Sequence, residues 1–367
     1  MIIGVPREVK NHEYRVGLTP SIVKILVDQG HTLLVQSNAG VKIGFTDELY
    51  IKAGAKIVPD LASVYEAELI VKVKEPQKTE YPLLRKNQIL FCYLHLAAEP
   101  ELLKHLVERK VIAIAYETIT DDEGRLPLLT PMSEVAGRVA LQAGASAMQI
   151  AYGGKGLLLG GVPGVAPARV KVIGGGVVGT QVARMALGFG ADVTILEKRL
   201  DRLRELDDLW GPRLKTLYST PSAIEESIAS ADLVVGAVLL PGKKAPKLIS
   251  EAMIARMEPG SVFVDVAIDQ GGCSETSRPT TFSDPIYQVH QVLHFCVTNM
   301  PAAYARTSTE ALSNAIAPFV IRLAHKGYAK AFAQDPHFLE GLNVCLGDVT
   351  NQAVSEDCGY PYVEWRG

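Results

Sequence analysis

The sequence lacks the features that would indicate a membrane, secreted or nucleic-acid-binding protein. No stretch approaches the roughly 18 uninterrupted apolar residues that a membrane span needs. The opening MIIGVPREVK reaches a proline and charged residues too early for a secretory signal. The net charge is only −3 and basic residues form no long run, which gives no support to a nucleic-acid or membrane-surface partner. We therefore expect a cytoplasmic protein that acts on small molecules.

Cysteine is scarce, and its five positions form no C-x-x-C pair. An odd, unpaired set is typical of free thiols in a reducing compartment rather than of a disulfide framework. His290 and His294 are four residues apart on an expected strand, where residues at that spacing share one face. No carboxylate or cysteine accompanies them at a spacing typical of metal ligands, so we expect no metal site.

The chain has 367 residues, too many for one ordinary core, because single cores stop growing near about 250–300 residues. Residues 1–126 and 169–298 each alternate short β-rich runs with helical patterns, which predicts parallel, doubly wound sheets. In the first region, Thr19 and Pro20 form a typical helix start, and Gly30 ends that helix. The expected strands are IIGV at 2–5, TLLVQ at 32–36, LIVKV at 69–73, ILFCYL at 89–94 and VIAIAY at 111–116, followed later by RVKVIG, DVTILE, LKTLYS, DLVVGAV, SVFVDVA and QVLHFCV.

Proline- and glycine-rich segments separate the two regions. LPLLTPMS at 126–133 precedes an Ala- and Gly-rich helical stretch, and an Ala-rich helix follows the NMP at 299–301. The composition of that last helix suits packing on the first region. We therefore predict an α/β protein of two doubly wound domains. A Rossmann domain at 129–305 is inserted into a discontinuous, Rossmann-like domain made of 1–128 and 306–367.

A dinucleotide-binding motif begins the second region. An apolar strand at 170–173 leads into a G-x-G-x-x-G segment and a helix, and the next strand ends on an acid. Gly174 permits a tight turn, Gly176 lets the backbone approach a pyrophosphate, and Gly179 allows close helix–sheet packing. The helix N-terminus would offer N–H groups to the phosphates. The alternative is a glycine-rich turn that binds nothing.

The acid at the end of the second strand bears on cofactor choice. Glu197 falls 23 residues after Gly174, near the spacing of the acid that accepts from the ribose hydroxyls. Its carboxylate would repel a 2′-phosphate, which favours NAD over NADP, although Lys198 and Arg199 follow directly and weaken that exclusion. Asp265 and Asp269 follow a later strand, where a carboxylate would lie near the nicotinamide.

Residues near strand ends of the first region have side chains suited to binding a carboxylate and to moving protons. Arg15 can clamp a carboxylate with two hydrogen bonds, unless it is a solvated surface arginine. Lys72 and Lys74 share one strand face, which does not fit a core and places at least one of them in a polar cleft. The alternative for Lys74 is an ion pair with Glu75 or another acid. His95 follows a buried-looking strand, where a histidine suits acid–base work near neutral pH or has a structural role.

These candidates gain weight because the sequence resembles the alanine dehydrogenase family, which also includes the α-subunits of pyridine nucleotide transhydrogenases. The resemblance extends along essentially the whole chain. The matching segments are IGVPREVKNHEYRVGLTP, VKVKEP, YLHLA, LPLLTPMSEVAGR, GGVPGV, KVIGGGVVG, GAVLLPGKKAP, VDVAIDQGGCSETSRPT, NMPAA and GLNV.

The resemblance implies an oxidoreductase that oxidises L-alanine with NAD to pyruvate and ammonia, and runs the reverse reductive amination. It implies catalytic roles for His95 and Asp269, and substrate contacts from Arg15, Lys74 and Asn299. It also implies a homo-oligomer, commonly a hexamer. The implied cofactor positions are Ser133, Gly174, Gly176, Val177, Val178, Gly179, Glu197, Arg202, Ser219, Val238, Leu239, Val266, Ala267, Ile268, Asp269, Arg278, Val297, Thr298, Asn299 and Met300.

Two departures from the family pattern concern the ligand sites. The family usually has Asp where this chain has Glu197, and the run after NMP reads Ala302-Ala303-Tyr304-Ala305. Tyr304 therefore either reshapes the substrate or nicotinamide pocket or belongs to a repacked turn. Three rival interpretations are the soluble part of a transhydrogenase, a saccharopine dehydrogenase, and an NAD-binding regulatory protein with an inactive substrate site. His95 and Lys74 in their motifs, the YLHLA and DVAIDQGG segments, and a chain that ends at Gly367 favour alanine dehydrogenase.

Overall fold

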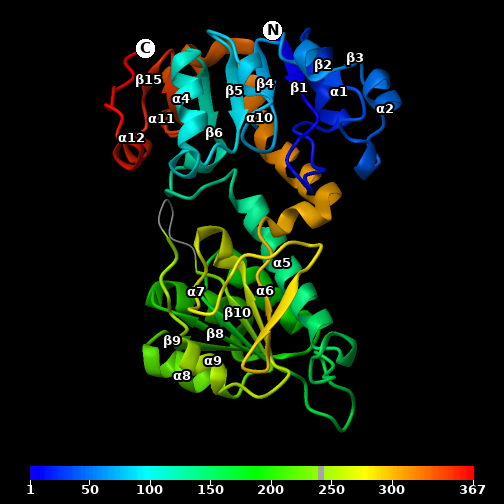
Figure 1. Cartoon of the computed structure of the whole chain (residues 1–367), viewed down its shortest axis with the longest axis vertical. Helices are drawn as coiled ribbons and strands as arrows, with labels where there is room; N and C mark the ends of the chain where they lie inside the picture. The colour runs from blue at the N-terminus through cyan, green and yellow to red at the C-terminus, as the bar shows by residue number, and fades with distance from the viewer. Residues whose placement is uncertain (239–243) are drawn as a thin grey trace. The chain divides into compact units, whose positions relative to one another are not determined.

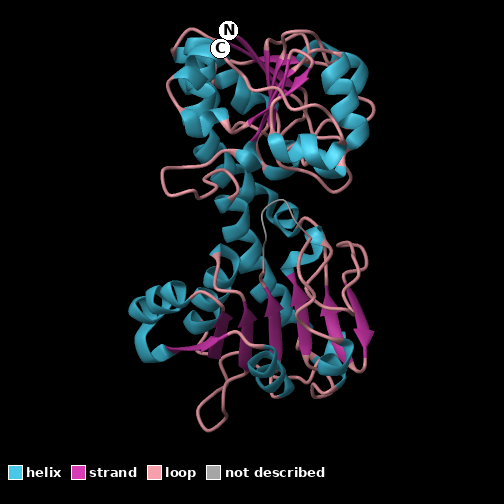
Figure 2. Ribbon diagram, turned by 90° about the vertical axis from the view of Figure 1, so that its left-hand side faces the viewer, coloured by secondary structure: helices cyan, strands magenta, loops and turns pink. Residues whose placement is uncertain are grey.

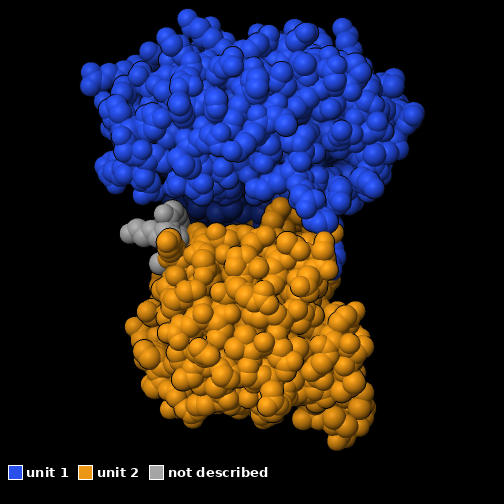
Figure 3. All heavy atoms as spheres, viewed as in Figure 1, with its two compact units in different colours: residues 1–132, 304–367 blue, residues 133–303 orange. Residues whose placement is uncertain are grey.

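A computed structural model describes residues 1–238 and 244–367. The chain forms two compact units, the first made of Met1–Met132 with Tyr304–Gly367 and the second of Ser133–Ala303 (Figure 3). The expected boundaries, after residues 128 and 305, lie within a few residues of these limits. The first unit is thus built from both ends of the chain.

The first unit contains an eight-stranded sheet in the order β15-β14-β6-β5-β4-β1-β2-β3 (Figure 1). Six strands are parallel, and β14 and β15 are antiparallel additions at one edge. The strands are β1 (Ile2–Val5), β2 (Thr32–Gln36), β3 (Lys56–Val58), β4 (Leu69–Val71), β5 (Ile89–Cys92), β6 (Ile112–Ala115), β14 (Leu342–Cys345) and β15 (Asp348–Val349). The expected strands of this region all form, whereas β3, β14 and β15 were not predicted.

Side chains alternate along these strands into two separate cores. Leu69 and Val71 enter the core that α1 and α10 cover, whereas Ile70 enters the core that contains the buried leucines of α4. Helices therefore pack on both faces, as a doubly wound sheet requires. The helices are α1 (Pro20–Asp28), α2 (Asp47–Lys52), α3 (Leu61–Val64), α4 (Pro100–Glu108), α10 (Ala305–Ala333), α11 (Pro336–Leu339) and α12 (Gln352–Cys358).

Two of these helices follow from clear sequence signals. The Thr19 hydroxyl caps α1 by accepting from the Ile22 N–H, and Pro20 occupies the first turn. Helix α10 buries Leu312, Ile316 and Val320 at four-residue spacing, in the same core as strands β1 and β4. That stripe explains why the C-terminal segment completes the N-terminal domain.

The second unit contains a seven-stranded sheet in the order β12-β13-β11-β10-β7-β8-β9. Figure 2 draws its strands in magenta, side by side. All its strands are parallel except β12, an antiparallel edge strand that was not predicted. They are β7 (Arg169–Ile173), β8 (Asp192–Glu197), β9 (Leu214–Tyr218), β10 (Leu233–Gly236), β11 (Val262–Asp265), β12 (Ile286–Val289) and β13 (Val292–Phe295). The helices are α6 (Val177–Gly188), α7 (Leu200–Trp210), α8 (Pro221–Ala229), α9 (Glu251–Ala255) and α5 (Thr130–Ala147), of which the first three residues belong to the first unit.

Strand β7 lies at the point where the strand order reverses. The chain continues from β7 to β8 and β9 on one side and then returns to β10 on the other side of β7. Val170 and Val172 share a core with α6, whereas Ile173 shares one with α8, so helices cover both faces. The predicted α/β fold of two doubly wound domains is confirmed. Ligands of such sheets bind outside the carboxyl ends of the strands at the switch point.

None of the described helices has both the length and the apolar content to cross a membrane. All five cysteines are free thiols, as predicted. His290 and His294 do not share a strand face: His294 is buried on β13, whereas His290 lies in the preceding turn and pairs with Glu251. The expectation of a shared face was wrong because β13 begins only at Val292.

Asp232, which precedes β10, joins several segments of the second unit. Its carboxylate accepts from the Arg169 guanidinium at 3.0 and 3.1 Å, from the Arg169 N–H at 2.8 Å, and from Lys155 at 2.9 Å. Burial alone would raise the pKa of Asp232, but the hydrogen bonds from Arg169 and Lys155 lower it to about 2. A depressed acid pKa stabilises the folded state above the unfolded pKa, and this stabilisation is lost as the pH falls.

We therefore expect Asp232→Asn to lower the free energy of unfolding by about 1–2 kcal/mol at pH 7, allowing for the exposure of Arg169. The difference from wild type should vanish between about pH 4 and pH 2, which denaturant titrations at several pH values would measure. Asp192, whose pair with Lys215 lies at the surface, gives a matched control. Asp192→Asn should cost less than about 0.5 kcal/mol. Equal losses for the two variants at every pH would contradict this account.

Candidate active site

Four adjacent strands of the first unit bring polar side chains to one edge of its sheet. β1, β4, β5 and β6 are neighbours and run parallel. The segments after the first three carry Arg15, Lys74 and His95, and the segment after β6 carries Glu117, which the sequence analysis missed. Because carboxyl ends of parallel strands meet at one edge, all four residues belong to the same rim of this unit.

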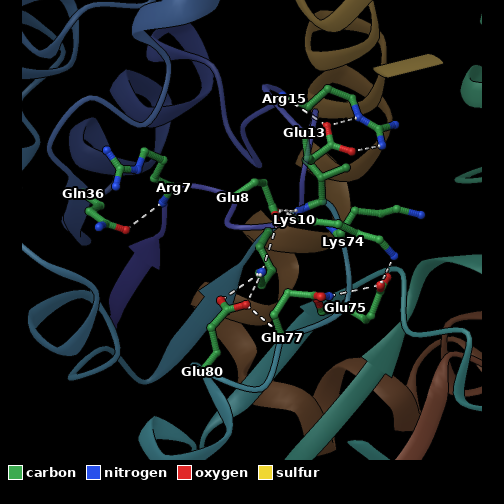
Figure 4. A network of polar contacts seen from close by, with 12 residues as sticks. Arg7, Glu8, Lys10, Glu13, Arg15, Gln36, Lys74, Glu75, Gln77 and Glu80 are labelled. Carbon is green, nitrogen blue, oxygen red and sulfur yellow. Dashed lines mark hydrogen bonds and ion pairs between the residues drawn. The ribbon is translucent and has the colours of Figure 1, made fainter. Parts of the chain in front are cut away.

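Arg15 is buried and paired rather than solvated. Only 2% of the residue is exposed, and its Nε and Nη2 donate to the two carboxylate oxygens of Glu13 at 2.6 and 2.5 Å (Figure 4). Nη1 donates to the Met132 sulfur at 3.1 Å. Burial would lower the pKa of Arg15, but the Glu13 carboxylate raises it above its ordinary value. The guanidinium is therefore a fixed, charged group whose Nε and Nη2 already bind Glu13.

Lys72 does not face a polar cleft. It lies in the core of the first unit, where a lysine was not expected. Its side chain is fully buried, and its ammonium lies 3.0 Å from carboxylate oxygens of both Glu8 and Glu80. Glu8 also accepts the N–H of Val73 at 2.6 Å and that of Lys74 at 3.3 Å. A buried ion cluster thus fixes the backbone from which the Lys74 side chain extends.

Lys74 is half-buried and lies close to Glu75 (Figure 4). Burial would raise the pKa of Glu75, but the charges of Lys74 and Lys10 lower it, and Lys10 also donates to Glu75 directly at 2.5 Å. The charge of Lys74 therefore acts on Glu75, in the direction that the alternative interpretation of Lys74 expected. Glu75 is itself buried.

His95 adopts an uncommon backbone conformation directly after β5. Its φ of 49° lies in the left-handed region, which is unfavourable for a residue with a Cβ atom. The imidazole stacks on the Tyr93 ring, with centroids 5.9 Å apart and planes 4° from parallel. Tyr93 donates to the Leu128 carbonyl at 2.6 Å, and the charge of Arg15 partly offsets the rise that burial causes in the pKa of Tyr93. Tyr93 therefore connects the surroundings of His95 with those of Arg15.

Most of the implied cofactor positions of the second unit lie at the carboxyl edge of its sheet. The glycine motif follows β7, Glu197 ends β8, Ser219 follows β9 and Val238 follows β10. The five-residue 3-10 helix η7 (Val266–Gln270) follows β11 and carries Val266, Ala267, Ile268 and Asp269. Val297, Thr298, Asn299 and Met300 follow β13. Leu239 lies outside the described residues.

The glycine motif has the geometry of a phosphate cradle. Gly174 has a φ of 103°. A Cβ on Gly179 would lie 1.9 Å from the Gly174 carbonyl oxygen, whereas one on Gly176 would meet nothing within 4 Å. Gly179 is therefore required for packing, whereas Gly176 borders open space at the N-terminus of α6. That N-terminus is the natural position for a pyrophosphate.

Glu197 and Arg202 hold the motif in shape. Glu197 accepts the Gly175 N–H at 2.8 Å and the N–H groups of Lys198 and Arg199 at 2.7 and 3.0 Å. Arg202, on α7, donates to the Gly175 carbonyl at 2.8 Å and to the Thr180 hydroxyl at 2.7 Å. The longer side chain at position 197 thus reaches the glycine turn itself.

Asp269 and Asn299 lie in contact with each other at the same edge of the sheet. The N–H of Asn299 donates to the Asp269 carboxylate at 3.2 Å, and Asn299 has a left-handed φ of 55°. The Arg278 guanidinium lies 4.0 Å over the Tyr287 ring, and Ser133 lies on α5, so these two residues are not at strand ends. No group of three His, Cys, Asp or Glu side chains among the described residues forms an arrangement that would hold a metal ion.

Comparisons with known proteins place this geometry in a family. Models of the N-terminal and C-terminal domains of alanine dehydrogenase/PNT match residues 4–136 and 140–352. The chain is 58% identical over 365 residues to the alanine dehydrogenase of Halomonas elongata, covering 99% of this chain and 98% of that protein. A solved L-alanine dehydrogenase has a TM-score of 0.95 and 48% identity, covering 97% of this chain and 99% of that one. A transhydrogenase from Sinorhizobium meliloti shares the fold, with a TM-score of 0.84 and 22% identity over 95% of this chain and all of its own.

The resemblance inferred from the motifs is confirmed, because two family models together match most of the sequence and the identity extends over nearly its whole length. The chain belongs to the alanine dehydrogenase/PNT family.

Proposed function

We propose that the protein catalyses the NAD-dependent oxidative deamination of L-alanine to pyruvate and ammonia, and the reverse reductive amination. The observation that carries this proposal is the 58% identity, over 99% of the chain, to a protein named alanine dehydrogenase. The rim of the first unit supports it, because an α-amino acid needs a fixed cation for its carboxylate and a nearby group that exchanges protons. Arg15 and His95 have those properties.

The described residues fit a dinucleotide. Open space beside Gly176, the N-terminus of α6 and the carboxylate of Glu197 would hold the pyrophosphate and the ribose. Glu197 supports NAD rather than NADP, because a carboxylate repels a 2′-phosphate. When bound, the nicotinamide supplies the acceptor for the hydride that leaves the alanine Cα. Asp269 and Asn299 would contact the cofactor near its reacting end.

The residues of the first unit would carry the remaining chemistry. Arg15 holds the substrate carboxylate, and Lys74 binds the oxygen that becomes the pyruvate carbonyl. His95 accepts a proton from the water that adds to the oxidised substrate, and returns one to the departing nitrogen. We further propose that the protein acts in the cytoplasm as a homo-oligomer, a hexamer, because the family resemblance implies that assembly. Sedimentation of the purified protein would test the hexamer.

Initial rates of NADH formation at 340 nm test the proposal directly. The purified protein would be assayed with NAD or NADP and a panel of L-amino acids, including alanine, serine and glycine. We expect a strong rate with L-alanine and NAD, and little with NADP. Absence of a rate with every amino acid, together with clear NAD binding, would favour a regulatory or transhydrogenase-like protein instead.

A further inference from the structure

We propose that Glu117 is a positioning residue for His95: it fixes the backbone of His95 and stabilises the imidazole while it carries a proton. The inference rests on the proposed function, because it assigns a partner to the histidine that exchanges protons with the substrate. Glu117 lies in the 3-10 helix η4 (Tyr116–Thr118), directly after β6 and beside the end of β5. Adjacent parallel strands therefore bring the two side chains together.

Three contacts join the Glu117 carboxylate to the backbone N–H groups of Leu94 and His95. Glu117 Oε1 accepts the N–H of His95 at 2.6 Å and that of Leu94 at 3.1 Å, and Oε2 lies 3.2 Å from the Leu94 nitrogen. These bonds hold consecutive N–H groups at the residue where the chain turns into the left-handed region. A carboxylate is a stronger acceptor for such groups than a neutral oxygen. It thus keeps His95 in a conformation that residues with a Cβ atom avoid.

The two imidazole nitrogens of His95 have different surroundings. Nδ1 lies 3.8 Å from Glu117 Oε1, a distance at which a protonated ring forms an ion pair. Nε2 has no hydrogen-bond partner among the described residues, and 44% of the side chain is exposed. The Tyr93 ring lies parallel to the imidazole, with the two centroids 5.9 Å apart. Nδ1 therefore faces the carboxylate, which leaves Nε2 as the atom that exchanges protons with the substrate.

This arrangement has a defined role when the oxidised substrate is hydrolysed. As water adds to the substrate carbon, its O–H bond breaks, its oxygen bonds to carbon, and its proton moves to Nε2 of His95. The imidazole is then positively charged, and the Glu117 carboxylate balances that charge. Nε2 of His95 then returns its proton to the nitrogen, the C–N bond breaks and the nitrogen leaves as ammonia. The hydroxyl oxygen forms the carbonyl, and the proton from its broken O–H bond moves to Nε2, from which it passes to solvent. A neighbouring carboxylate lowers the free energy of each state in which the ring is charged.

A single substitution separates the backbone role from the charge role. Glu117→Gln keeps an oxygen that accepts the Leu94 and His95 N–H groups but removes the negative charge. If Glu117 only anchored the backbone, this variant would retain wild-type turnover. Glu117→Asp keeps the charge on a shorter side chain and serves as the conservative variant. Glu108→Gln, an exposed glutamate on α4, is the matched control.

We expect kcat for alanine oxidation to fall about 10- to 100-fold in Glu117→Gln, part of the effect that acid–base catalysis contributes. The Glu117→Asp variant should retain more activity, and Glu108→Gln should match wild type. NADH affinity, measured by fluorescence, and the thermal midpoint should stay near wild-type values in all three. Because proton transfer would become slower relative to hydride transfer, the isotope effect with [2-²H]alanine should shrink and the solvent isotope effect should grow.

Wild-type kcat and unchanged isotope effects in Glu117→Gln would overturn the inference, as would a lower kcat in Glu117→Asp than in Glu117→Gln. An inactive wild-type protein would instead overturn the proposed function. The two failures are therefore distinguishable.

Discussion

Replacing His95 by asparagine should lower kcat for alanine oxidation by about 10²- to 10⁴-fold while changing the NADH dissociation constant no more than a few-fold. The expected loss is large because the amide cannot take up and return the protons that hydrolysis moves. Asparagine is preferable to alanine because it tolerates the left-handed backbone of His95, with its φ of 49°. Steady-state rates and a fluorescence titration with NADH would measure the two quantities.

His290 offers a matched control for this substitution. It also has a left-handed backbone, with a φ of 47°, and its side chain is 43% exposed, close to the value for His95. His290→Asn should therefore retain wild-type kcat. Near-normal turnover in His95→Asn, or an equal loss in His290→Asn, would contradict the acid–base role of His95.

Three glycines of α6 and its cap should give three different results when each is changed to alanine. Gly179→Ala places a Cβ 1.9 Å from the Gly174 carbonyl oxygen, so the helix must move away from β7. We expect a loss of about 1–3 kcal/mol in the free energy of unfolding, together with lost NAD binding. Gly176→Ala meets no protein atom within 4 Å, so it should leave stability unchanged but obstruct the pyrophosphate and weaken NAD at least about tenfold.

Gly188→Ala is the control at the end of the same helix, where a Cβ also meets nothing within 4 Å. It should keep NAD affinity and raise stability slightly, by up to about 1 kcal/mol, because alanine favours the helix. Calorimetry of unfolding and of NAD binding would measure the whole series. Unimpaired NAD binding in Gly176→Ala would contradict the cradle at the N-terminus of α6.

The sequence predicted most of the parallel strands because many of them, such as β5, β6 and β10, are short apolar runs in which every residue is buried. It did not predict β3, β14 or β15, which have four residues or fewer, and it did not predict the antiparallel edge strand β12. Short strands at a sheet edge, or next to it as β14 is, depend on the neighbour with which they pair, so their own sequence has a weak pattern.

In the candidate site, too, the sequence predicted residues that follow local patterns and missed contacts between distant segments. Arg15, Lys74 and His95 were identified because they follow apolar runs and match family motifs. The burial of Lys72 in the core was not predicted. Its partners Glu8 and Glu80 belong to other segments of the chain, and only the fold brings them to the buried ammonium. Glu117 was missed although it also follows a predicted strand. Its proximity to His95 depends on the pairing of β5 with β6.

The most direct test of the central claim follows one hydrogen atom. L-alanine carrying deuterium at Cα would be incubated with the protein and NAD, and the recovered NADH analysed by mass spectrometry and NMR. The proposed function predicts one deuterium per NADH, at nicotinamide C4, with pyruvate as the other product. Unlabelled NADH, or no reduction of NAD while the protein still binds it, would contradict the assignment of this protein as an alanine-oxidising enzyme.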